Sequence, residues 1–128
     1  MIELSELSKY TVVLAEDDEM TRESWAMILS RFCRQVRSAP DGQAALELIE
    51  AQLPDLLITD LEMPRLDGIA LVDILKERYP DLPIIVATAF NDEAHQVPKA
   101  DAFLTKPIDK TELKETMRQV ARPEPRQG

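Results

Sequence analysis

The sequence predicts an α/β fold, a doubly wound sheet of five parallel strands with helices on both faces. Short apolar runs without polar alternation are separated by longer segments in which apolar residues recur at helical spacing. A strand that lacks polar alternation is typical of a parallel sheet covered on both faces. There are no internal repeats, and right-handed crossovers make 2-1-3-4-5 the simplest strand order.

The predicted strands are short, and four of the five are largely apolar. They are Tyr10–Ala15, Gln35–Ala39, Leu56–Ile58, Ile84–Ala87 and Ala102–Leu104. The third run is too short for a helix, and Pro54 and Pro64 bound it. We therefore expect a buried strand that delivers one carboxylate, Asp60, into the loop that follows.

Helices are predicted between these strands and after the last one. The first spans about Met20–Phe32, the second follows a cap at Asp41, the third opens at Asp67-Gly68, and the last spans about Lys110–Ala121 after a cap at Asp109. The segment between the fourth and fifth strands, residues 91–100, contains Pro98 and few apolar residues. We therefore expect a shortened or irregular fourth helix there.

The chain of 128 residues is long enough for one domain with a substantial core. We expect residues 1–9 to be a lead-in or partial helix, residues 10–121 to form the domain, and residues 122–128 to be a linker or disordered tail. The chain is then either a single-domain regulator or one part of a longer protein, separated near Pro123–Pro125.

Charge and composition exclude several classes of function. The net charge of −9 and pI near 4.6 argue against direct binding of nucleic acid, which needs basic patches. No apolar stretch is long enough to cross a membrane, and the first residues lack the basic start of a signal peptide. The single cysteine, Cys33, lies in an apolar helical pattern and is expected to be a buried structural thiol. The natural compartment is the cytoplasm.

Four of the five predicted strands are followed by a side chain that could bind a metal or take part in a reaction. Glu16 and Asp17 follow the first strand, Asp60 the third, Thr88 the fourth and Lys106 the fifth. The carboxyl ends of parallel strands share one edge of the sheet, so these side chains are expected to converge. Taken singly, each has an ordinary structural explanation as a helix start, a turn residue or a solvated surface lysine.

Three converging carboxylates repel one another unless a cation compensates them. Oxygen ligands without a nearby histidine or cysteine suit a hard ion such as Mg2+, which also accepts a phosphate oxygen. An aspartate beside Mg2+ can attack phosphorus, and Lys106 and Thr88 could then neutralise and orient the phosphoryl group. A cis bond between Lys106 and Pro107 would aim the lysine inward, although Pro107 could also simply end the strand.

These motifs, in this order, resemble those of the receiver domains of bacterial two-component response regulators. The resemblance covers Thr11 to about Ala121 and implies the flavodoxin-like version of the predicted fold. The matching segments are Val12–Asp18, Pro54–Pro64 with Asp67-Gly68, Ile85–Ala89 and Phe103–Pro107.

The resemblance implies that Asp60 accepts a phosphoryl group from a histidine kinase or a phosphotransfer protein. It implies that Asp17 binds Mg2+ directly, that Glu16 binds it largely through water, and that the backbone carbonyl of Glu62 completes the protein ligands. Such a domain is a phosphoacceptor rather than an enzyme in its own right. Its output would go to an effector domain or to a downstream protein.

The resemblance also implies a switch. Thr88 and Lys106 would contact the phosphoryl group, and Phe103 stands where the family places the aromatic residue that turns inward as the threonine shifts. Ordinary core packing is the other explanation for Phe103.

Two departures from the family pattern affect the prediction. The stretch from Thr88 to Lys106 is several residues shorter than usual and contains Pro98, which predicts an atypical signalling surface. Phe90 lies two residues after Thr88, as Glu62 does after Asp60, at positions that tune attack by water in this family. The bulky apolar side chain of Phe90 is expected to hinder the attacking water molecule and so to prolong the lifetime of the phosphoryl group.

Three other functions compete with this one. A phosphatase of the haloacid dehalogenase type would place its nucleophilic aspartate after the first strand, whereas here the acidic pair comes first. A flavodoxin-like electron carrier would need a phosphate-binding loop where this chain has acids. A receiver fold that binds partners without phosphorylation is the stronger alternative, and a phosphorylation assay separates it from the leading hypothesis.

Overall fold

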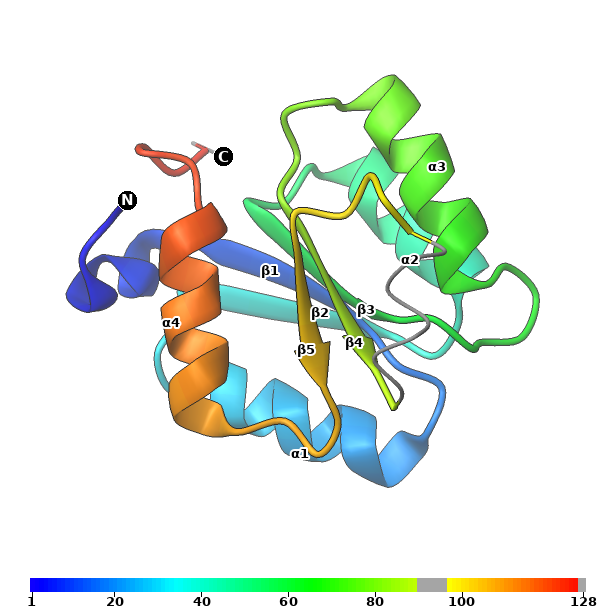
Figure 1. The fold of residues 1–128 in the computed structure, drawn as a ribbon, viewed down its shortest axis with the longest axis horizontal. Coiled ribbons are helices and arrows are strands. Elements are labelled where there is room, and N and C mark those ends of the chain that lie inside the picture. The colour runs from blue at the N-terminus through cyan, green and yellow to red at the C-terminus, as the bar shows by residue number, and fades with distance from the viewer. Residues whose placement is uncertain (90–96, 127–128) are drawn as a thin grey trace.

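A single parallel sheet organises the protein, whose computed structural model describes residues 1–89 and 97–126 (Figure 1). The strand order is β2-β1-β3-β4-β5, which confirms the predicted order and places β1 and β3 side by side at the centre. The strands are β1 (Thr11–Ala15), β2 (Gln35–Ala39), β3 (Leu56–Asp60), β4 (Ile84–Thr88) and β5 (Ala102–Thr105).

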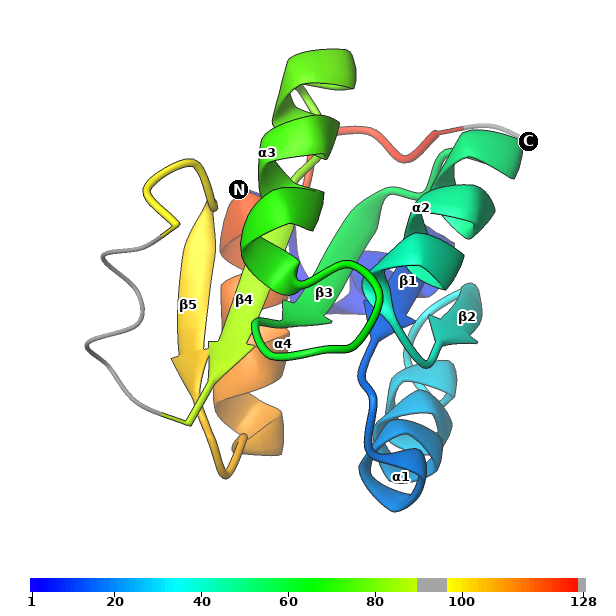
Figure 2. The ribbon, with the colours of Figure 1, turned by 90° about the vertical axis from the view of Figure 1, so that its right-hand side faces the viewer.

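Helices cover both faces of the sheet, as a doubly wound fold requires (Figures 1 and 2). They are a 3-10 helix η1 (Leu4–Lys9) and the α-helices α1 (Glu19–Ser30), α2 (Gly42–Ala51), α3 (Gly68–Arg78) and α4 (Lys110–Val120). Successive residues of β1 point to opposite faces: Val13 packs in the core under α2 and α3, and Val12 in the core under α1 and α4. This explains the unalternating apolar strands.

Each α-helix in the described part of the chain begins at an aspartate whose side chain accepts a hydrogen bond from the backbone N three residues on. Asp41 and Asp109 cap α2 and α4 as predicted, with donors Ala44 N at 2.8 Å and Glu112 N at 2.9 Å. The remaining caps are Asp18 for α1 and Asp67 for α3.

Asp60 differs from its prediction, because it is the last residue of β3 rather than a loop residue. It is paired in register with Ala87 of β4, so the backbone of the strand holds it in place. The carboxylate therefore projects from a rigid part of the sheet.

The segment between β4 and β5 is described at Ala89 and from residue 97 onward, and these residues form no helix. Val97 is buried in the core, and the backbone N of Ala100 donates to the carbonyl of Val97 at 3.1 Å, which closes a turn. The expected shortened or irregular fourth helix falls mostly outside the described residues and stays a prediction. Phe90 and residues 91–96 lie outside them.

Segments at both ends of the chain pack onto the body of the domain: η1 lies against α4, and Arg126 lies at the start of β3, away from Asp60. In the expected lead-in, Ile2 and Leu7 are buried, and η1 packs against α4. In the expected tail, Arg126 N donates to Oδ1 of the fully buried Asp55 at 2.5 Å. Arg126 is therefore tied to a buried acceptor far away in the sequence, while the expectation of a linker or disordered tail over residues 122–128 stays a prediction. No helix in the described part of the chain could span a membrane.

Candidate functional site

Three carboxylates gather at the carboxyl end of the two central strands. Glu16 and Asp17 directly follow β1, and Asp60 ends the neighbouring strand β3. One oxygen from each lies within 4.8 Å of the others. Glu16 is buried, Asp60 is half-buried and Asp17 is exposed, so the group opens to solvent on the side of Asp17. The three carboxylates converge because β1 and β3 are parallel neighbours that end at the same edge of the sheet.

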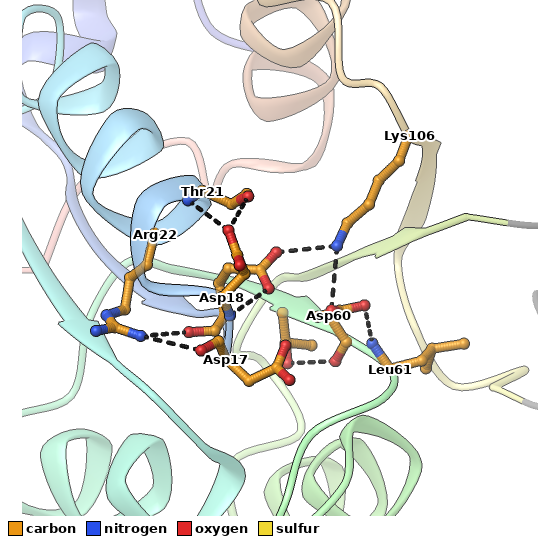
Figure 3. A network of polar contacts seen from close by, with 9 residues as sticks. Asp17, Asp18, Thr21, Arg22, Asp60, Leu61 and Lys106 are labelled. Atoms are coloured by element: carbon orange, nitrogen blue, oxygen red, sulfur yellow. Dashed lines mark hydrogen bonds and ion pairs between the residues drawn. The ribbon is translucent and has the colours of Figure 1, made fainter.

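Lys106 reaches this group from the far edge of the sheet (Figure 3). Its Nζ donates to Oε1 of Glu16 at 2.9 Å and to Oδ2 of Asp60 at 3.1 Å. Its backbone N donates to the carbonyl of Thr88 at 2.8 Å, and the peptide bond between Lys106 and Pro107 is cis. The lysine is thus the cation of the site rather than a solvated surface residue.

The backbone holds the other carboxylate oxygens. The backbone N of Leu61 donates to Oδ1 of Asp60 at 2.8 Å, and the backbone N of Asp18 donates to Oε2 of Glu16 at 3.1 Å. Each of these two carboxylates is therefore held at both oxygens, which fixes its orientation before any ligand arrives.

The charges in the site are unbalanced, because one ammonium faces three carboxylates. Burial and the adjacent Glu16 raise the pKa of Asp17, so its ionised form is disfavoured. Burial opposes the charge of Lys106, but hydrogen bonds from Lys106 to Glu16 and Asp60 outweigh it and raise the pKa of this lysine. A divalent cation would relieve the remaining repulsion.

The donor set fits Mg2+ better than a softer metal. The gathered ligands are all carboxylate oxygens, and the exposed side at Asp17 leaves room for the waters that Mg2+ retains. The carboxylate of Glu62 is not part of the group, and its side chain is exposed. The role predicted for Glu62 belongs to its backbone carbonyl and stays a prediction.

Thr88 and Phe103, the two residues of the predicted switch, lie on the neighbouring strands β4 and β5. Thr88 ends β4 one residue after Ala87, the register partner of Asp60, and is 1% exposed. Phe103, on β5, is half-buried and packs against the core under α2 and α3. Their switching roles stay predictions, and Phe90 lies outside the described residues.

Two glycines at helix starts, Gly42 and Gly68, shape the loop after Asp60 through close approaches that the sequence did not predict. A Cβ on Gly68 would lie 2.2 Å from the carbonyl oxygen of Asp60, and one on Gly42 would lie 1.9 Å from the carbonyl oxygen of Leu66. Both glycines directly follow a capping aspartate, which is the signal that could have singled them out. They allow the loop from Asp60 to Gly68 to lie close against the starts of α2 and α3.

Comparison with protein-family models matches residues 12–118 to the response regulator receiver domain. The chain belongs to this family, the phosphoacceptor modules of two-component signalling. It is 37% identical to response regulator MprA of Mycolicibacterium vanbaalenii, and 38% identical to MprA of Mycobacterium ulcerans, each over 115 residues. Each match covers 87% of this chain and 50% of the relative, so the chain spans about half the length of these curated relatives.

Solved structures share the fold. The N-terminal domain of an uncharacterized protein from Wolinella succinogenes superposes with a TM-score of 0.80 at 31% identity, over 87% of this chain and 93% of that one. Response regulator TrrA from Thermotoga maritima, in complex with Mg(2+)-BeF, also has a TM-score of 0.80, over 87% and 98%. At 24% identity, the second likeness supports the fold alone.

Proposed function

We propose that Asp60 accepts a phosphoryl group from the phosphohistidine of a histidine kinase or of a phosphotransfer protein, with Mg2+ held by Glu16 and Asp17. The single observation that carries the proposal is the bridge from Lys106 Nζ to Asp60 and Glu16, at 3.1 and 2.9 Å. It joins an aspartate, a cation and an acidic pair from three separate strands.

The transfer is a displacement at phosphorus. An oxygen of Asp60 forms the new bond, the bond from phosphorus to the donor's imidazole nitrogen breaks, and that nitrogen keeps the electron pair. The bonds from Leu61 N and Lys106 hold Asp60 in place for the attack. Bound Mg2+ would neutralise charge on the phosphoryl oxygens. Lys106 and the hydroxyl of Thr88 would contact those oxygens afterwards, and the backbone carbonyl of Glu62 would add a metal ligand.

Incubation with a small acyl phosphate tests this directly. Intact-mass spectrometry is expected to find one added phosphoryl group when Mg2+ is present and none when it is chelated. Asp60→Asn is expected to remain unmodified, while the matched variant Asp73→Asn, on the exposed side of α3, is modified like the wild type. Modification that persists in Asp60→Asn would contradict the assignment.

The second candidate is a binding module that works without phosphorylation. It is favoured only by the short connection between β4 and β5, which is unusual for the predicted signalling surface. Under this hypothesis the wild type gains no phosphoryl group from either the acyl phosphate or a kinase.

Three finer parts of the proposal follow from the sequence. The phosphorylated state acts on an effector domain or a downstream protein in the cytoplasm. Phe103 turns inward as Thr88 moves toward the phosphoryl group. The bulk of Phe90 slows hydrolysis, so Phe90→Glu is expected to lose its phosphoryl group faster, and an unchanged rate would contradict this last part.

A further inference from the structure

We infer that Arg22 is a positioning residue for the metal ligands Glu16 and Asp17, acting through their backbone and not through their carboxylates. This inference rests on the proposed Mg2+ site and adds to it a residue outside the reacting group. Arg22 lies in the first turn of α1, four residues after the capping residue Asp18.

The contacts of Arg22 are with the loop itself. Its Nη1 donates to the carbonyl of Glu16 at 3.0 Å and, more weakly, to the carbonyl of Asp17 at 3.5 Å. Figure 3 shows the guanidinium on the side of the loop away from Asp60 and Lys106. One side chain thus holds both residues of the acidic pair from behind, while their carboxylates face the site.

With Arg22 in place, every polar group of Glu16 has a partner. Its backbone N donates to the carbonyl of Ala39 at 3.1 Å, its carbonyl accepts from Arg22, and its two carboxylate oxygens accept from Lys106 and from Asp18 N. Of the two backbone groups of Glu16, the N–H bonds to another backbone group, whereas the carbonyl accepts from the Arg22 side chain. Removing that donor would free the peptide between Glu16 and Asp17 to rotate, and this peptide sets where the Asp17 carboxylate points.

The charge of Arg22 and its hydrogen bonds have opposite effects on the affinity for Mg2+. A guanidinium near a cation site repels the cation, so loss of the charge alone would tighten Mg2+ binding. Loss of the hydrogen bonds alone would weaken binding, because Asp17 would be ordered less well before the metal arrives. The sign of the change in affinity therefore separates positioning from electrostatics.

The experiment compares Arg22→Met, Arg22→Lys and Arg31→Met. The methionine replaces the unbranched stem and removes the guanidinium with its donors and charge, whereas the lysine keeps the charge and one donor group. Arg31 follows α1 at its other end, and its side chain contacts Met27 rather than the loop, so Arg31→Met is a control with the same change of charge. Mg2+ is titrated without any phosphodonor, and the fluorescence of Trp25, the single tryptophan, is followed. Trp25 lines the same hollow as Glu16 and Asp60.

Arg22→Met is expected to raise the Kd for Mg2+ about tenfold, as is usual when a supporting contact of a metal ligand is lost. Arg22→Lys is expected to lie between it and the wild type, and Arg31→Met within about twofold of the wild type. In phosphorylation from an acyl phosphate, the Mg2+ concentration for half-maximal rate should rise by the same factor as the Kd. The rate at saturating Mg2+ should be close to that of the wild type.

A Kd for Arg22→Met that is unchanged or lower than that of the wild type would overturn the inference. So would a fall in the maximal rate with no change in Kd. If Arg22→Met fails to fold, as judged by circular dichroism, the Kd of Arg22→Lys decides in the same way. Failure of the wild type to bind Mg2+ would overturn the proposed function as well, whereas binding with equal affinity by every variant overturns only the role of Arg22.

Discussion

The Nζ of Lys106 lies 3.1 Å from Oδ2 of Asp60, although 46 positions separate the two residues in the chain. Asp60 ends the central strand β3, and Lys106 follows the edge strand β5, so the lysine must reach across the end of β4. The same nitrogen contacts Glu16. One ammonium thus links two carboxylates that come from the ends of separate strands.

Lys106→Met is expected to destabilise the protein in the absence of Mg2+. It leaves Glu16, whose side chain is 7% exposed, without its cation, which costs about 1–3 kcal/mol in free energy of unfolding. Urea denaturation at neutral pH measures the loss, and adding Mg2+ should recover part of it. Lys99→Met removes an exposed lysine 3.8 Å from Asp73 and serves as control. Equal losses in the two variants would count against a special role for Lys106.

Gly42→Ala is expected to disturb the loop that carries Glu62. The added methyl group would lie 1.9 Å from the carbonyl oxygen of Leu66, so the start of α2 or the loop has to move. Overpacking of this kind costs about 1–3 kcal/mol, which a urea denaturation curve resolves. Glu47→Ala, at an exposed position of the same helix, should change stability by less than about 0.5 kcal/mol. A Gly42→Ala variant as stable as the wild type would show that the loop yields easily.

Asp55→Ala is expected to release the C-terminal residues 122–126 and to weaken the start of β1. The Asp55 carboxylate is fully buried and accepts from the backbone N and the hydroxyl of Thr11, at 2.7 and 3.1 Å, and from Arg126 N. Buried donors left without an acceptor cost about 1–3 kcal/mol each. Hydrogen exchange should become faster at Arg126 N and Thr11 N, with Asp73→Ala, at an exposed position of α3, as control. Unchanged protection at Arg126 would refute the proposed anchoring.

The stability of the protein should fall at alkaline pH because Cys33 is buried. Burial raises the pKa of its thiol from 9.0 to about 12. The folded state therefore holds this proton more tightly than the unfolded chain does, and the stability gained is complete below pH 9 and is lost as the pH rises toward 12. The free energy at stake is roughly 4 kcal/mol at most.

Chemical denaturation between pH 8 and 11 measures this decline in the free energy of unfolding. The decline should be smaller in Cys33→Ala, because the variant has no thiol to ionise. The same burial should protect Cys33 of the native protein from a thiol reagent at pH 8. Rapid modification under native conditions would mean that Cys33 is more accessible than its 8% exposure indicates.

Much of the fold could be predicted because most helices and strands have a signal in their own local sequence. Unalternating apolar runs define the strands, and aspartates such as Asp41 and Asp109 define helix starts through bonds to residues a few positions away. The convergence of Glu16, Asp60 and Lys106 could be predicted as well, because parallel topology brings strand ends to one edge.

The parts that could not be predicted depend on contacts between segments distant in the sequence, or on individual contacts between pairs of atoms. The docking of Arg126 on Asp55 joins residues 71 positions apart, in a stretch whose prolines and charges favoured a disordered tail. The close approach of Gly42 to Leu66 has no periodic signal. The bond from Arg22 to the carbonyl of Glu16 depends on how far one rotamer reaches, which spacing alone does not determine.

The most direct test of the central claim is to locate the phosphoryl group. After incubation with Mg2+ and an acyl phosphate, borohydride reduction converts an aspartyl phosphate to homoserine, and peptide mass spectrometry then identifies the position. We predict homoserine at position 60 and at no other aspartate, with none formed when Mg2+ is chelated. Homoserine at Asp17 or at another acid, or a stable phosphoester in place of a reducible acyl phosphate, would contradict Asp60 as the phosphoacceptor.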